Sequence, residues 1–219
     1  MDSDQTAPAA VVATATASQR LGHALSVVLH PLALGTPIAI GVGVREFGGF
    51  SFEVFQVGVI VGTLGLLFPL ALLFLLVRTG KISDLFMTRH EDRRWVYPIG
   101  FADLLLIFFV FWAYEAPQTI LATVAAGFLA VCCMAIGNRF LKASIHCAGN
   151  AGILLALCWV EGWLFSPLLL LIPATIWSRL AVREHTPAEA LAGTILGILP
   201  TAAAMAFFLG PPVFGGYGR

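Results

Sequence analysis

Three side chains near the end of the chain have types and spacing suited to phosphate chemistry. In the stretch SRLAVREHTPAEALAG, residues 178–193, five residues separate Arg179 from His185, and Glu189 follows His185 by four. A four-residue step puts two helical side chains on one face, where a carboxylate fixes the imidazole tautomer and makes the histidine a nucleophile toward phosphorus. Arginine supplies fork-shaped donors to the oxygens of a transferring phosphoryl group. The stretch therefore predicts a phosphate site.

The same stretch has a structural alternative. Residues 186–189, Thr-Pro-Ala-Glu, form a capping-box pattern with proline at the first helical position, and this pattern would make Glu189 part of a helix start. The two roles overlap, because a helix that begins at Thr186 holds His185 just outside its positive end, still near Glu189. The sequence leaves open whether Glu189 orients the histidine, caps the helix or does both.

A second polar segment, KASIHCAG at residues 142–149, opens another apolar run. Ser144 and His146 stand at the start of that run, where free backbone N–H groups and the helix dipole favour an anion. Such a start can hold phosphate oxygens while the histidine donates a proton. The alternative is that Ser144 caps the helix and His146 anchors it at the membrane interface. Another histidine, His30 in VVLHPLALG, is predicted to be a packed or interface-facing residue.

The third polar segment, KISDLFMTRHEDRRWVYP at residues 81–98, has five basic side chains between Lys81 and Arg94. A phosphate clamp and an amphipathic linker lying on lipid headgroups both account for them. Its acidic residues, Asp84, Glu91 and Asp92, suggest a different enzyme, a prenyl or phosphatidyl transferase that binds a diphosphate through Mg²⁺. The segment by itself does not decide among these alternatives.

The elements that position these segments are predicted to be membrane-spanning helices. The chain is 59% hydrophobic and 11% charged, which leaves too little polar surface to coat a soluble globule. We expect an all-α, polytopic helical bundle with six or seven transmembrane helices, each close to the ~20 residues that cross a bilayer. The apolar stretches lie near residues 24–44, 54–77, 98–114, 119–137, 147–164, 166–182 and 190–209. Residues 21–210 are predicted to form one transmembrane catalytic domain between flexible tails at 1–20 and 211–219.

The span order places the segments 78–97, 138–146 and 179–189 on one face, because two crossings separate each from the next. Ten of the 12 Lys and Arg residues then share that face, which predicts that it is cytoplasmic. The formal net charge is zero, so no bulk attraction to nucleic acid is expected. Four cysteines without a C-x-x-C pair indicate neither a zinc site nor a disulfide framework.

Together, the three segments resemble the signature of the type 2 phosphatidic acid phosphatase superfamily, integral membrane enzymes that cleave phosphate from lipids. That signature runs K-x6-R-P, then P-S-G-H, then S-R-x5-H-x3-D. The third motif is nearly complete here, with Glu189 in place of Asp, and the second is partial, with Ala-Ser-Ile-His at residues 143–146. The first is closest to a divergent S-D…R-x-E-x-R…P pattern, which residues 83–98 approach.

The resemblance implies a role for each matched residue. His185 would attack phosphorus to give a phosphohistidine, Glu189 would orient it, and His146 would protonate the leaving lipid oxygen as general acid. The implied phosphate-binding residues are Arg179, Ser144, Arg89, Arg93, Arg94 and Lys142. No metal or cofactor is implied. The expected substrate is a phosphorylated membrane lipid such as phosphatidate or an isoprenoid diphosphate, and a lipid-binding or transport protein with a decayed site is the non-catalytic alternative. The oligomeric state stays open.

Overall fold

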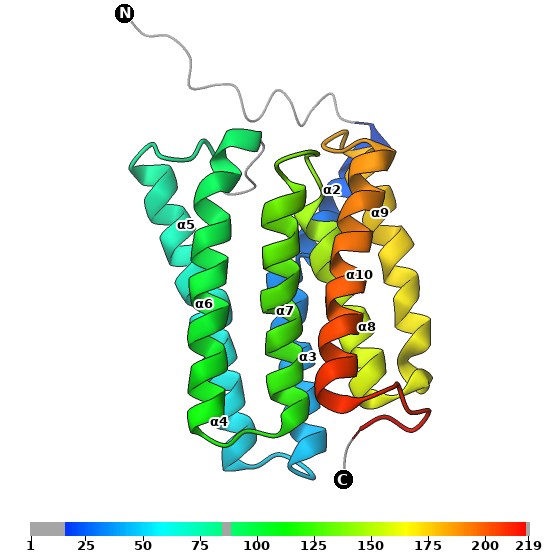
Figure 1. Cartoon of the computed structure of the whole chain (residues 1–219). Helices are drawn as coiled ribbons and strands as arrows, with labels where there is room; N and C mark the ends of the chain where they lie inside the picture. Colours follow the sequence, from blue (N-terminus) through cyan, green and yellow to red (C-terminus); the bar gives the residue numbers. More distant parts are fainter. Residues whose placement is uncertain (1–15, 85–88, 218–219) are drawn as a thin grey trace, which may run out of the picture.

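The chain folds as an all-α bundle, as predicted (Figure 1). The computed structural model describes residues 16–84 and 89–217, without the side chains of His90 and Arg93. The helices in chain order are α2 (Ala17–Val28), α3 (Pro31–Glu46), α4 (Phe52–Ile60), the π-helical η1 (Val61–Leu67), α5 (Phe68–Arg78), the 3-10 turn η2 (His90–Asp92), α6 (Arg93–Ala113), α7 (Gln118–Gly137), α8 (Ile145–Glu161), the 3-10 segment η3 (Trp163–Leu170), α9 (Leu171–Ala181) and α10 (Pro187–Leu209).

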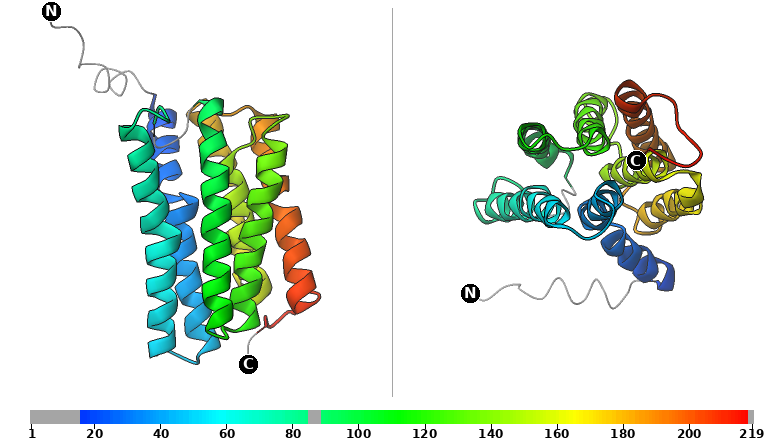
Figure 2. Two further views of the ribbon diagram at one scale, coloured as in Figure 1. Left: turned by 60° about the vertical axis from the view of Figure 1, so that its left-hand side comes forward. Right: turned by 90° about the horizontal axis from the view of Figure 1, so that it is seen from below.

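The bundle has the helix lengths of a multi-pass membrane protein. Among the described residues, five helices are long and apolar enough to span a bilayer, and the α2–α3 pair, bent by 42°, makes a sixth if it is one span. Six, the upper of these two counts, equals the lower of the two predicted numbers. The remaining apolar helix, α8, is shorter, and it lies in the interior among α3, α7, α9 and α10 (Figure 2). Helix α8 therefore touches most elements that could contribute to a shared site.

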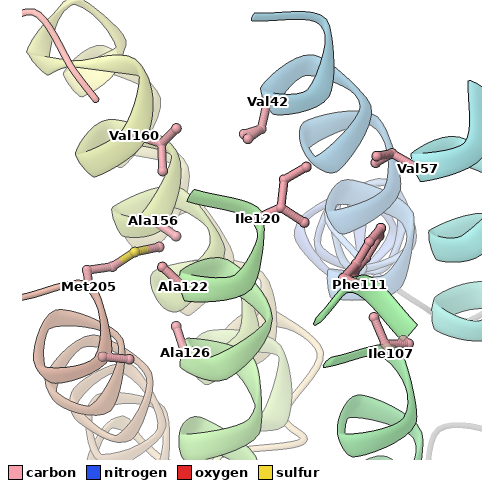
Figure 3. Packing of buried hydrophobic residues seen from close by; sticks show 11 residues of the cluster. Val42, Val57, Ile107, Phe111, Ile120, Ala122, Ala126, Ala156, Val160 and Met205 are labelled. Atoms are coloured by element: carbon pink, nitrogen blue, oxygen red, sulfur yellow. The ribbon is translucent and has the colours of Figure 1, made fainter. Parts of the chain in front are cut away.

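The charged segments gather at one end of the bundle, as the span order predicts. The end of α5, the start of α6, the α7–α8 connection and the α9–α10 connection all lie at the same end, which we call the charged end (Figure 1). The largest apolar core lies toward the opposite end, where side chains from α3, α4, α6, α7, α8 and α10 pack together (Figure 3). Two smaller apolar clusters, one around Leu76 and Ile82 and one around Met134 and Ala148, continue this packing toward the charged end.

The predicted flexible N-terminal tail, residues 1–20, overlaps the first helix. Helix α2 begins at Ala17, because Thr16 and Gln19 form a capping box in which each side chain accepts a hydrogen bond from the other residue's backbone N–H. Residues 17–20, assigned to the tail, are therefore helical. Residues 1–15 lie outside the described part of the chain.

The predicted flexible C-terminal tail has no helix but is fixed to the bundle. The backbone N–H of Tyr217 donates to the carbonyl of Val160 at 2.7 Å, and the guanidinium of Arg45 donates to the carbonyl of Gly215 at 2.7 Å. Arg45 also pairs with the carboxylate of Glu161 at 2.9 Å. The prediction failed because these partners come from α3 and α8, far away in the sequence.

Small residues bring α8 and α10 into close contact. A Cβ added at Gly193 would lie 2.4 Å from the carbonyl oxygen of Ser144, and one added at Gly197 would lie 2.1 Å from that of Ala148. On the facing helix, a Cβ at Gly152 would lie 2.9 Å from the hydroxyl of Thr201. Such small-residue seams let helix backbones approach closely in membranes. The seam sets the spacing between the first turns of α8 and α10, which carry the predicted catalytic residues.

Candidate functional site

Glu189 caps α10, and its carboxylate also lies beside His185. Its Oε2 accepts a hydrogen bond from the backbone N–H of Thr186 at 2.8 Å, and the Thr186 hydroxyl accepts one from the backbone N–H of Glu189 at 3.3 Å. The same Oε2 lies 3.5 Å from Nδ1 of His185. The capping box therefore holds the carboxylate beside the histidine, and the orienting role of Glu189 stays a prediction.

His185 lies at the edge of an open cavity at the charged end. The cavity has a volume of about 430 Å³, and its lining includes Arg183, Glu184, His185 and Glu189. His185 is 9% exposed, so most of its ring is packed while one edge faces the cavity. A small anion reaching this cavity from the aqueous side would therefore meet the histidine.

Arg179 is held in place by two side chains that the sequence motifs do not contain. It is 3% exposed, and its Nη1 donates to the hydroxyl of Ser26 at 2.9 Å. Its Nη2 donates to a carboxylate oxygen of Glu184. Ser26 lies on α2, and its hydroxyl donates to that of Ser178, the residue before Arg179, at 3.2 Å. A buried guanidinium with fixed donors is a preorganised anion-binding group.

The turn between α9 and α10 presents Glu184 and His185. Arg183 has a φ of 57°, a left-handed conformation that ends α9 and that costs a non-glycine residue on the order of 1 kcal/mol. The backbone carbonyl of Glu184 accepts a hydrogen bond from Nζ of Lys142 at 3.4 Å, which ties the turn to the segment before α8. Lys142 thus lies beside this turn, and its predicted role as a phosphate ligand stays a prediction. Glu184 was missed because its role depends on its distance from Arg179 in the fold.

His146 lies in the first turn of α8 and packs against a second histidine. Its ring and that of His30 are nearly perpendicular, with centroids 4.8 Å apart. His30 caps α3, since its Nδ1 accepts a hydrogen bond from the backbone N–H of Leu32 at 3.3 Å. His30 is therefore packed, as predicted, but its neighbour is a predicted catalytic residue. It also lies close enough to Arg179 for their charges to interact.

The break between α2 and α3 is clamped onto α8 one turn beyond His146. The side-chain amide of Asn150 donates to the carbonyl of Leu29 at 2.8 Å and to the hydroxyl of Thr175 at 2.9 Å. Gly149 leaves room for Pro31, because a Cβ there would lie 2.7 Å from the proline ring. These contacts bring the α2–α3 segment to the site, with Ser26 and His30 on it. No short motif in the sequence signals them.

Ser144 serves as the cap that sequence analysis proposed as its alternative role. Its hydroxyl accepts a hydrogen bond from the backbone N–H of Cys147 at 3.4 Å, and the residue is fully buried. Its own backbone N–H donates to the carbonyl of Glu189 at 3.1 Å, which joins the starts of α8 and α10. Its assignment as a phosphate ligand stays a prediction.

Arg94 lies in a different cavity from the one that His185 lines. It shares that cavity with Tyr97, Asn138 and Arg139, and its guanidinium lies over the ring of Trp95 at 5.8 Å. Arg89 is exposed, and the side chain of Arg93 lies outside the described residues. The structure thus joins the second and third motifs through Lys142 and Ser144, whose partners are Glu184 and Glu189. Among the described residues, the lining of the cavity at His185 includes neither His146 nor Arg179. The described part of the first motif lies in separate surroundings.

Two of the three acidic residues of the first segment, Asp84 and Asp92, have local partners. Asp92 accepts hydrogen bonds from the backbone N–H of Ser83 at 2.9 Å and from its hydroxyl at 2.5 Å. The same hydroxyl lies 3.0 Å from the carboxylate of Asp84. Within the described ranges, no group of three or more His, Cys, Asp and Glu side chains is placed to hold a metal ion. The carboxylates of Asp84 and Asp92 therefore accept hydrogen bonds within the segment itself.

The fold and this cluster define a class of protein: a multi-pass, all-α membrane protein with a polar cluster at one end of an apolar bundle. The cluster is built from α2, the α2–α3 break, the first turn of α8, the end of α9 and the first turn of α10. Comparisons with protein-family models, with characterised proteins and with solved structures found no match for this chain.

Proposed function

We propose that this protein is an integral membrane phosphatase that hydrolyses a lipid phosphate or diphosphate through a phosphohistidine at His185. One observation carries the proposal: the carboxylate of Glu189, fixed by its capping box, lies 3.5 Å from Nδ1 of His185 at the edge of an open cavity. A carboxylate at Nδ1 leaves Nε2 to act as the nucleophile. The buried guanidinium of Arg179 lies in the same cluster, where it stabilises negative charge that develops on phosphorus.

The proposed reaction has two steps, transfer of the phosphoryl group to His185 and hydrolysis of the phosphohistidine. First, Nε2 of His185 forms a bond to phosphorus as the bond from phosphorus to the lipid oxygen breaks, and His146 gives a proton to the leaving oxygen. Second, His146 takes a proton from a water molecule whose oxygen attacks the phosphohistidine, which releases phosphate and restores His185. The lipid alcohol, or the lipid monophosphate if the substrate is a diphosphate, stays in the bilayer.

In this mechanism, the carboxylate of Glu184 competes with the substrate for Arg179. Its carboxylate accepts a hydrogen bond from Nη2 of Arg179, a donor that a phosphoryl group would also use. Substrate therefore displaces Glu184, and the turn that carries it opens toward the cavity. Glu184→Gln weakens this competition, so we expect it to lower the KM for the lipid phosphate and the inhibition constant of inorganic phosphate. Equal constants in Glu184→Gln and the unaltered protein would contradict this role.

The proposal places the site on the cytoplasmic side, because ten of the 12 Lys and Arg residues are predicted to lie on the face that carries it. A cysteine introduced at Arg183, which is exposed, tests this placement with a membrane-impermeant thiol reagent on intact cells. Protection in intact cells and labelling in inverted vesicles are expected. Labelling of intact cells would place the site on the outer side.

The decisive experiment measures phosphate release from phosphatidate and from an isoprenoid diphosphate by the protein in lipid nanodiscs. His185→Ala is expected to reduce release to the background rate, because it removes the nucleophile. The matched control is His23→Ala, which removes an exposed histidine from α2. Equal release by His185→Ala and the control would refute the phosphatase. An acid-labile phosphohistidine that is absent from His185→Ala would exclude a decayed site, and loss of activity in EDTA would favour the Mg²⁺-dependent transferase.

A further inference from the structure

A second polar cavity lies at the charged end, between the first turn of α6 and the end of α7. Its volume is about 450 Å³, and its lining includes two arginines, Arg94 in the first turn of α6 and Arg139 just after α7, together with Glu91, Asn138 and Tyr97. Asn138 is 7% exposed and is the residue that follows the last turn of α7, immediately before Arg139. This cavity does not share a lining residue with the one at His185.

An apolar cavity of about 230 Å³ runs into the membrane-spanning part of the bundle. Small side chains of α7 and α8 leave this space open, among them Ala130, Gly127 and Gly152, and Leu104 lines it from α6. Tyr97 lines both the apolar cavity and the polar one. The two cavities are therefore adjacent, with Tyr97 in the lining of both, a charged part at the membrane surface and a hydrocarbon-like part below it. This is the layout of a single amphipathic ligand.

We propose that the two cavities together bind one membrane phospholipid, with its phosphodiester at Arg94 and Arg139 and one acyl chain in the apolar cavity. Two arginines and Glu91 give the polar cavity a charge of one positive, counted from its lining side chains. A phosphodiester carries one negative charge and matches it, whereas a phosphomonoester approaching two negative charges would also meet the carboxylate. The ligand is therefore a diester lipid rather than the monoester or diphosphate of the proposed reaction.

The bound chain would contact the back of the candidate catalytic cluster. The apolar cavity is also lined by Pro31 and Ile145, the residues next to His30 and His146, and by Gly149, on which Pro31 packs. A chain that fills this space supports the α2–α3 break where it meets α8. The phospholipid site is thus separate from the reacting groups and is in contact with the residues that position them.

The test measures bound lipid and does not depend on catalysis. The purified protein is depleted of lipid in detergent, incubated with dioleoyl phosphatidylglycerol, a diester, or with dioleoyl phosphatidate, a monoester, and analysed by native mass spectrometry. We expect the diester to be retained in preference to the monoester. We expect Arg94→Gln/Arg139→Gln to lower retention of the diester by about tenfold or more, since each arginine can donate charge-assisted hydrogen bonds to the phosphodiester.

Two further variants make the result specific. Arg20→Gln/Arg78→Gln removes the same charge from exposed residues of α2 and α5 and should leave retention unchanged. Ala130→Phe fills the apolar cavity and should lower retention, and Ala130→Leu is the milder substitution if the larger one fails to fold. The proposal would be overturned by an equal loss of retention in the control pair or by a preference for the monoester. It would also be overturned if Arg94→Gln/Arg139→Gln or the filled cavity caused no loss. His185→Ala should retain the diester normally, so inactivity as a phosphatase would leave this test intact.

Discussion

Replacing Gly197 by alanine should separate α8, which carries His146, from α10, which carries Glu189. The added Cβ would lie 2.1 Å from the carbonyl oxygen of Ala148, about 1.3 Å closer than the 3.4 Å at which ordinary van der Waals contact begins. The nearest atoms all belong to the backbone of α8, so no side chain can rotate away. The helices must move apart by about that distance, or one of them must bend.

The expected cost has two parts. Overpacking costs about 1–3 kcal/mol, and the better helix propensity of alanine offsets up to about 1 kcal/mol of it. A net loss of about 1–2 kcal/mol lowers the unfolding midpoint by several degrees for a chain of this length. Because the first turns of α8 and α10 carry His146 and Glu189, a shift on the order of 1 Å should also slow phosphate release by about 100-fold.

The assay pairs thermal unfolding in detergent with phosphate release in nanodiscs. Gly41→Ala is the matched control, since Gly41 lies on an exposed face of α3 and an added Cβ meets no atom within 4 Å. Its unfolding midpoint should stay the same or rise. Gly193→Ala should behave like Gly197→Ala, because its Cβ would lie 2.4 Å from a backbone oxygen. If Gly197→Ala unfolds and turns over like Gly41→Ala, the backbone contact does not set the helix spacing and the argument fails.

Three further predictions test other contacts. His30→Asn keeps a side-chain helix cap but removes the ring beside His146. Phosphate release should therefore fall several-fold and its pH profile should shift, while the unfolding midpoint stays unchanged. Unchanged kinetics would mean that the ring has no positioning role. The Ser83 hydroxyl holds the pKa of Asp92 below its usual range, so this contact stabilises the fold above about pH 4, and the stabilisation is lost as the pH falls through the lower folded pKa. In a plot of unfolding midpoint against pH, Asp92→Asn should therefore reduce the fall of the midpoint at acid pH. An unaltered fall would exclude the contact. Arg45→Met should speed proteolysis of the C-terminal segment without changing phosphate release, and equal cleavage rates would show that another contact holds the segment.

Local patterns in the sequence determined the class of fold and the ends of several helices. Apolar runs of membrane-spanning length predicted the all-α bundle, because each such run must satisfy its backbone hydrogen bonds within a helix. The Thr-Pro-Ala-Glu pattern predicted the start of α10, and the order of the runs predicted that three charged segments share one end. These features depend on residues a few positions apart or on counting spans, so no knowledge of packing was needed.

Only the tertiary structure decided which side chains surround the predicted catalytic residues. Ser26, His30 and Glu184 join the cluster because Asn150 and Gly149 dock the α2–α3 break onto α8 and because the α9–α10 turn brings Glu184 back to Arg179. The C-terminal segment was predicted to be flexible, and this prediction was wrong for a related reason, since the residues that anchor the segment lie on α3 and α8. Contacts between helices distant in sequence depend on side-chain shape at the interface, and hydropathy and local spacing do not encode that shape.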